Sequence, residues 1–464
     1  MRRLPHAAIN FMSLHRRRLP TAGLTALAGL LVLVAAGDVA LAQRGSAPQA
    51  KPRSANRQAP PTKEAAPSVP KNFVPPRPIP DVMTLNKELM TEEEEKELKK
   101  ELLLKYQKAL REGELNAVSR DLIERGVKYR LYKMTRKANR QMLPIMRHEL
   151  LAQDMAYASK GVGAPIAGRE FFLEQVTKVS EELLDNNFHV RLNVVMILSN
   201  LILVEEDSRN GVKEKAYTPA IEILLKVFDD KTQLEAIKVS AVQGMERICM
   251  VGEPSRDQRL RVAEILVEEL ADPMANAWYQ MRLAQALGNV GIIHDRQPRP
   301  FVVQSLATVL VDQKRDWQVR AQAAKALGRA PLDGSINVGL ISYAIVDLAQ
   351  QGAAAYNQSM ANEAAAEASV PYWKDFFVTL YLAFQPIDAA ERQAGRGLIL
   401  RNRTGAYEQL LPVVRHVIHQ DKQPIEKELL DALADWIAKN PPNSFSVAPG
   451  EPPIIAPQKV AGNK

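Results

Sequence analysis

The sequence predicts an all-α protein that consists largely of repeated helical hairpins. Three observations support this prediction. Alanine, leucine and glutamate are abundant, while aromatic residues make up only 6% of the chain, which favours helix over sheet. A helical motif recurs four times between residues 188 and 330. A capping box at Thr91–Glu94 marks the start of an earlier helix with acidic residues first and basic residues later.

Length and composition limit the class of protein. A chain of 464 residues fits two to four ordinary domains, and with 46% hydrophobic and 25% charged residues it can bury a core. The single cysteine, Cys249, excludes an intrachain disulfide framework, a thiolate zinc finger and an iron–sulfur cluster. Its apolar neighbours predict that Cys249 behaves as a small buried hydrophobe.

Residues 1–42 have the pattern of a secretory signal peptide. Three arginines at positions 16–18 precede an apolar run over 24–36, and Ala40-Leu41-Ala42 has the spacing of a cleavage site. We therefore expect export to the periplasm or cell envelope of a bacterium, with cleavage after Ala42. One alternative is an uncleaved membrane anchor, although the apolar run is shorter than the roughly 20 residues that span a bilayer. A start at Met12 would shorten the basic region to an ordinary length.

Two Pro-rich segments flank the helical part. Residues 43–80 contain ten prolines and almost no large apolar side chains, so they cannot bury enough surface to offset the entropy of ordering. We expect a disordered, cationic linker there. Pro441-Pro442 ends the last helix, and residues 441–464 are predicted to be a disordered tail.

The basic charge of the chain lies outside its folded part. The formal net charge is +8, which divides into +4 for residues 1–42, +6 for residues 43–80 and −2 for residues 81–464. The overall charge therefore argues against nucleic acid as a partner of the folded part.

An N-terminal helical region is predicted over residues 81–168. In the helix after Thr91, Leu98, Leu102, Tyr106 and Leu110 form one apolar stripe. This helix therefore packs through a single face. It is either a short coiled-coil arm or the first helix of the core.

A basic amphipathic helix is predicted over residues 125–147, where eight basic residues occur without an acidic one. Several of the basic side chains fall on one helical face. The alternative is that acidic residues close in the fold, such as the Glu92–Glu95 run, balance these charges. The candidate contacts to an anionic polymer or membrane surface are Arg130, Lys133, Arg136, Lys137 and Arg140.

Residues 169–440 are predicted to be a repeat of helical hairpins. The second helix of each hairpin carries an apolar and then, usually, a basic residue, followed by small or apolar pairs. The clearest copy spans Val319 to Gly328. A hairpin of this size cannot enclose its own apolar face, so it stacks on its neighbours. The apolar residue near the motif's end recurs after 47, 42 and 40 residues, at Leu198, Met245, Leu287 and Leu327.

Small residues in the motif, such as Ala323, Ala324 and Ala326, let adjacent helices approach closely. Beyond Gly328 the pattern weakens, and its remaining copies are degenerate. We expect these later helices over residues 337–351, 372–384, 407–419 and 425–437.

The motif resembles that of the HEAT-repeat family, in which an aspartate before the second helix and a Val-Arg pair inside it recur. The clear copies cover about a third of the chain. The resemblance implies a right-handed α-solenoid that binds other macromolecules along its concave face, and a ladder between basic and acidic residues of neighbouring repeats. The third copy departs from the family, with Gln280 in the basic position. The implied ladder residues are Arg191, Lys238, Arg320, Asp185, Asp230 and Asp312, with Asp316 as an alternative to Asp312.

No catalytic, cofactor or metal site is predicted. The sequence lacks the GxSxG, P-loop and GxGxxG motifs. His416 and His419 are three residues apart on a predicted helix and could meet one metal, but no third ligand lies nearby in sequence. We expect both to be helix-surface histidines near a C-terminus, where a positive charge is favourable.

These observations predict a non-catalytic, exported scaffold that binds another protein through the concave face of the repeats, with no small-molecule substrate. One alternative is a binder of an anionic polymer or membrane surface through residues 125–147. Another is an enzyme or metal protein that uses His416 and His419, since some proteins with related repeats are lyases. The salt dependence of binding distinguishes the protein-binding scaffold from the anionic-polymer or membrane binder, because binding to phosphates weakens steeply with ionic strength.

Overall fold

The computed structural model describes residues 87–159, 167–361, 363–401, 405–420 and 422–455. All of them belong to the unit Arg77–Lys464. The predicted signal peptide and linker, residues 1–80, lie outside the described residues. The described part is mostly helical, as predicted, with one antiparallel pair of short strands, β1 (Ile202–Val204) and β2 (Lys215–Ala216).

The first helices pack as part of the core. They are α2 (Glu92–Glu101), α3 (Leu103–Glu112) and α4 (Ala117–Tyr132), and the predicted capping box of Thr91 and Glu94 begins α2. The predicted stripe is largely buried at Leu102, Tyr106 and Leu110. Because α3 packs on α4, and α4 on α7, this region is the first part of the core rather than a free arm.

The prediction of a single helix over residues 125–147 is wrong. Helix α4 ends at Tyr132, and the backbone at Arg136 is extended. The N–H of Lys137, which would donate to the Lys133 carbonyl in a continuing helix, donates instead to Oε1 of Glu88 at 2.7 Å. Pro144 lies in the first turn of α5, where its missing N–H costs nothing. After α4 come η2 (Lys133–Thr135), η3 (Lys137–Met142), α5 (Leu143–His148), η4 (Glu149–Asp154) and α6 (Met155–Tyr157).

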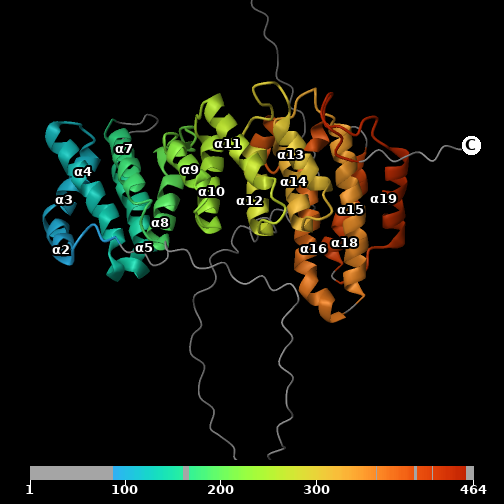
Figure 1. The fold of residues 1–464 in the computed structure, drawn as a ribbon, viewed down its shortest axis with the longest axis horizontal. Coiled ribbons are helices and arrows are strands. Elements are labelled where there is room, and N and C mark those ends of the chain that lie inside the picture. The colour runs from blue at the N-terminus through green and yellow to red at the C-terminus, as the bar shows by residue number, and fades with distance from the viewer. Residues whose placement is uncertain (1–86, 160–166, 362, 402–404, 421, 456–464) are drawn as a thin grey trace, which may run out of the picture. The chain divides into compact units, whose positions relative to one another are not determined.

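Each predicted copy of the motif is the second helix of a hairpin. The second helices α8, α10, α12 and α14 contact one another in chain order, and α14 contacts α16 in the same way (Figure 1). The hairpins are α7 (Ala167–Glu182) with α8 (Phe188–Ser199), α9 (Ala220–Asp229) with α10 (Glu235–Val251), α11 (Arg256–Leu270) with α12 (Ala277–Asn289), and α13 (Phe301–Val311) with α14 (Trp317–Arg329).

Small residues of the motif allow these contacts. Ala323 and Ala324 are completely buried, and Ala326 nearly so. A side-chain carbon added to Gly288 of α12 would lie only 2.8 Å from Cα of Ala326 on α14. The two helices can therefore reach their observed separation only with glycine at position 288.

Longer helices follow the clear repeats. Helix α15 (Val338–Met360) extends beyond the predicted 337–351, and α16 (Glu363–Phe384) contains the predicted 372–384. The ring of Trp373 packs near those of Trp317 and Phe376, which joins α16 to α14. The remaining elements are α17 (Ala389–Gln393), η5 (Leu398–Leu400), α18 (Ala406–His419) and α19 (Lys427–Lys439).

The prediction of a disordered tail over residues 441–464 is wrong for residues 441–455; residues 456–464 lie outside the described part. The backbone N–H of Asn337 donates to the Val447 carbonyl at 2.8 Å. Val447 is completely buried and Ala448 nearly so, and both belong to the hydrophobic core. These two apolar residues stabilise the segment despite its prolines.

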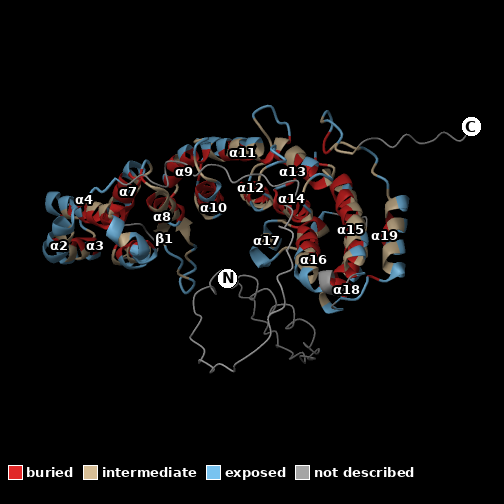
Figure 2. Ribbon diagram, turned by 60° about the horizontal axis from the view of Figure 1, so that its bottom comes forward, coloured by how far each residue is buried: buried red, intermediate tan, exposed pale blue. Residues whose placement is uncertain are grey.

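Buried residues lie mainly on the sides of helices that face neighbouring helices (Figure 2). Cys249 is among them, as predicted, and burial raises the pKa of its thiol to about 11. Among the described helices, none is both long and apolar enough to cross a membrane.

Candidate binding site on helices α10, α12 and α14

Two variable positions of the motif line a cavity of about 440 Å³ on α10, α12 and α14. The first position lies two residues before the leucine or methionine near the end of each copy, which is Met245, Leu287 or Leu327. The second position lies four residues after the first. Positions four residues apart share one face of a helix. The first position holds Gln243, Gln285 and Lys325, and the second holds Arg247, Asn289 and Arg329.

A buried carboxylate on α10 is held by amides from α12. Glu246 is only 7% exposed. Its oxygens accept from Nε2 of Gln285 at 3.1 and 3.2 Å, and Oε1 accepts from Nδ2 of Asn289 at 2.7 Å. These bonds offset the cost of burying the charge and fix the orientation of both amides.

Arg329 on α14 is 4% exposed, although it carries a permanent charge. Its Nη1 donates to the Gln385 carbonyl at 3.2 Å, and its Nε lies 3.0 Å from Oε1 of Glu391 on α17. Neither its buried Nε nor its buried Nη2 makes a hydrogen bond with a described residue. Burial lowers the pKa of Arg329, which reflects the cost of holding the charge there.

Lys325 lies one turn before Arg329 and is partly buried. Within the described ranges, its ammonium has no hydrogen bond and no ion pair. Burial and the neighbouring Arg329 lower the pKa of Lys325. The carboxylates of Asp375, Glu391 and Glu246 act on it through space only. The cavity therefore contains a cation that the fold does not neutralise by direct contact.

The segment around α17 forms one wall of the cavity. Nη1 of Arg396 donates to Oδ1 of Asn289 at 2.9 Å, and the N–H of Gly397 donates to the Gly328 carbonyl at 2.7 Å. Gly397 has φ +90°, a left-handed conformation that favours glycine. These two bonds fasten the segment to the ends of α12 and α14, and Figure 2 shows α17 on that side of the two helices.

Three of the five predicted basic contacts form ion pairs inside the N-terminal region. Arg130, which is 4% exposed, donates to Asp154 at 2.7 and 2.9 Å and to Glu149 at 2.5 Å. Lys133 donates to Glu149 at 3.0 Å. Arg136 pairs with Glu95 and, at 3.3 Å, with Glu92, as the alternative interpretation of these charges expected.

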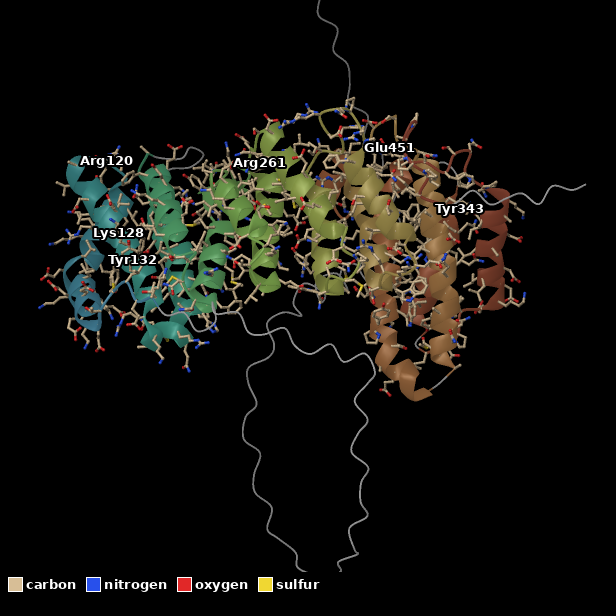
Figure 3. All side chains as sticks on the ribbon, in the orientation of Figure 1. Arg120, Lys128, Tyr132, Arg261, Tyr343 and Glu451 are labelled. Atoms are coloured by element: carbon tan, nitrogen blue, oxygen red, sulfur yellow. The ribbon has the colours of Figure 1, made fainter. Side chains whose placement is uncertain are left out.

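The other two predicted contacts, Lys137 and Arg140, are exposed. Arg140 contacts the ring of His189. The break at Arg136 separates η3 from α4, so the five side chains do not share one helical face. Lys128 on α4, labelled in Figure 3, pairs with Glu124 at 2.9 Å.

The basic ladder residues bridge elements, but not through the implied aspartates. Lys238 pairs with Glu269 of α11 at 3.0 Å. Arg320 donates to the Leu310 carbonyl at 3.0 Å and to Gln351 of α15 at 3.1 Å. Arg191 donates to the Asn186 carbonyl at 2.7 Å.

The implied aspartates serve local structure instead. Asp230 accepts from Thr232, and Asp312 pairs with Arg315 at 3.3 Å. Asp185 pairs with Lys87, while Asp316 caps α14. In the described part of the chain, no ion pair joins Arg191, Lys238 or Arg320 to these aspartates.

His416 is 5% exposed, and its Nε2 lies 3.2 Å from the Gln423 carbonyl. It is therefore a buried histidine rather than the predicted surface one. In the ranges that the structure describes, no group of three metal-binding side chains is close enough to hold an ion.

Sequence reasoning missed Lys325, Arg329 and Glu246. The sequence signal that could have identified Lys325 is a polar residue that recurs two positions before the leucine or methionine in successive copies of the motif. Comparisons with models of protein families, with curated proteins and with solved structures found no match. The function is therefore inferred from the chemistry of the chain's own residues.

Proposed function

We propose that the chain is a non-catalytic, exported scaffold of α-solenoid form that binds another protein along α10, α12 and α14. One observation carries the proposal: equivalent positions of three successive repeats line one cavity. These positions carry polar side chains of different types in the three copies, while the apolar and small positions of the motif maintain the stack.

The lining suits a polypeptide. Gln243 and Gln322 have side-chain amides without a hydrogen bond to another described residue, and each amide can both donate to and accept from a peptide backbone. Met250 and Ile387 also line the cavity and are 54% and 47% exposed. Exposed apolar side chains beside unbonded amides are typical of protein interfaces.

Export remains part of this proposal and is supported by the pattern of residues 1–42. With residues 1–42 kept as an uncleaved anchor, the Pro-rich residues 43–80 would act as an extended tether between the membrane and the repeats. The basic segment 125–147 is the weaker candidate for binding, since Arg130, Lys133 and Arg136 already have acidic partners.

Affinity capture with the chain from residue 43 onward tests the proposal. The immobilised chain is exposed to cell-envelope extract at about 50 and about 200 mM salt, a range over which phosphate-type binding weakens steeply. We expect the same defined protein to be retained at both salt concentrations. The Gln243→Trp variant, which places an indole in the cavity mouth, should lose it.

Glu264→Trp is the matched control, because Glu264 is exposed on α11 and does not line the cavity. This variant should retain the partner as well as the unaltered chain does. Retention of the partner by the Gln243→Trp variant, or capture of only mixed anionic material that high salt removes, would contradict the proposal.

A further inference from the structure

The cavity contains two cationic groups with unused hydrogen-bonding capacity. Lys325 and Arg329 are four residues apart on α14, and both line the cavity. The ammonium of Lys325 has no hydrogen bond or ion pair with any described residue, and the buried Nη2 of Arg329 has no hydrogen-bond partner there either. Nη2 of Arg329 is closed to solvent, whereas the Lys325 ammonium is not, so the ammonium is the group that can meet a ligand that accepts hydrogen bonds.

None of the nearby acidic groups forms an ion pair with Lys325 among the described residues. Glu246 is bonded to Gln285 and Asn289, and Glu391 lies 3.0 Å from Nε of Arg329, on the edge of the guanidinium that Nε shares with Nη2. The charge of Asp375 on α16 favours the protonated form of Lys325 through space only. Burial raises the pKa of Asp375 itself.

We propose that the cavity binds an aspartate or glutamate side chain of the partner polypeptide at the ammonium of Lys325. This inference rests on the protein-binding function proposed above. An ammonium donates to carboxylate oxygens, and such charge-assisted hydrogen bonds are the strongest that proteins form.

The surroundings favour a side chain of another protein over other occupants. A cavity of about 440 Å³ accommodates a side chain with its adjoining backbone. Met250 and Ile387 provide apolar contacts for the residues beside the acid. The chain's own linker has the wrong sign, since residues 43–80 carry a net charge of +6.

Fluorescence anisotropy with short labelled peptides tests the inference on the chain from residue 43 onward. One peptide carries a central glutamate between leucines, and a second has glutamine in its place. We expect the glutamate peptide to bind about tenfold more tightly, because a hydrogen bond to a charged group is stronger than one to a neutral group. Equal binding of the two peptides would overturn the inference.

Substitution of Lys325 tests whether this residue causes the preference for the glutamate peptide over the glutamine peptide. The Lys325→Met variant should lose the glutamate preference, and Lys325→Arg should keep most of it. Lys314→Met is the matched control, because Lys314 is an exposed lysine before α14 that does not line the cavity. Circular dichroism confirms that each variant is folded. A glutamate preference that persists in Lys325→Met would overturn the inference.

A third probe separates a peptide from a small carboxylate. Glutarate presents a carboxylate without a peptide backbone, and we expect it to compete at least about tenfold more weakly than the glutamate peptide. Equal competition would overturn the assignment to a polypeptide. If Lys325→Met still captures the envelope protein that Gln243→Trp loses, the carboxylate inference fails while the protein-binding function stands.

Discussion

Nε of Arg329 on α14 lies 3.0 Å from Oε1 of Glu391 on α17. Oε2 of the same carboxylate accepts from the backbone N–H of Ile387 at 2.6 Å. Glu391 therefore joins the end of a repeat helix to the segment that closes one side of the cavity. The pair holds the wall of the proposed site in place and leaves Nη2 of Arg329 unbonded.

Removing this carboxylate should destabilise the fold. In the Glu391→Ala variant, Arg329 stays buried without a counter-ion, which costs about 3–5 kcal/mol when one partner of a buried pair is lost. Urea unfolding followed by circular dichroism measures the change. Glu97→Gln, an exposed site on α2, is the control and should alter the free energy of unfolding by less than about 0.5 kcal/mol. Equal effects would show that the pair is not structural.

Replacing Lys325 by methionine should stabilise the protein, because methionine fills similar space without a charge in a poorly solvated position. We expect a gain of about 1 kcal/mol in the free energy of unfolding at neutral pH. A residue that lowers stability where it stands is expected at a binding site rather than in a passive core. A loss of stability in Lys325→Met would contradict this role.

The same substitution has a defined pH dependence. The pKa of Lys325 is lower in the folded chain than its ordinary value of 10.5, so the unfolded chain binds more protons between the two values. The free energy of unfolding of the unaltered protein therefore rises with pH through that window. The advantage of Lys325→Met should be full below the folded pKa of Lys325 and shrink as the pH rises from there toward 10.5, which urea unfolding at several pH values measures.

We expect Arg130 to stabilise the fold rather than to contact a binding partner. Asp154 is completely buried, and burial raises its pKa while the adjacent Arg130 opposes that rise. The Arg130→Ala variant leaves this acid unpaired and should lose about 3–5 kcal/mol of stability. Lys137→Ala, at an exposed position of the same segment, should change stability by less than about 0.5 kcal/mol. Similar losses in both variants would contradict the structural role of Arg130.

Gly288 should tolerate no side chain. A methyl group in Gly288→Ala meets the backbone of Ala326 and forces α12 and α14 apart, at a cost of about 1–3 kcal/mol. Gly334→Ala is the control, because a side-chain carbon there has open space around it. Thermal unfolding of the two variants compares them, and an unchanged midpoint for Gly288→Ala would disprove the close contact.

The sequence predicted the helical hairpins well because their signal is local and periodic. The capping box at Thr91 and the buried alanines of α14 follow directly from residue order. The break at Arg136 was missed because the N–H of Lys137 donates to Glu88, which is 49 residues away in the chain, instead of continuing the helix. The packed tail was missed because Val447 is buried in a core built from distant parts of the chain, where its carbonyl accepts from the N–H of Asn337.

The candidate site could not be predicted in the same way. The residue types at the positions of Lys325 and Glu246 differ between the copies of the motif. The contacts of these side chains depend on helices that are about 40 residues apart in the chain. The acidic partners of Arg130 and Lys133, Asp154 and Glu149, lie beyond the segment that contains the basic residues. Charge counting along the chain therefore overestimated the free positive charge of residues 125–147.

Site-specific photo-crosslinking in the living cell tests the central claim most directly. A photoreactive residue replaces Met250, which is 54% exposed at the cavity, or Glu268 on α11, whose side chain is 74% exposed away from the cavity lining. We predict that the Met250 position crosslinks to one defined protein of the cell envelope and that the Glu268 position does not. Equal crosslinking at both positions, or none at Met250, would contradict a binding site on α10, α12 and α14.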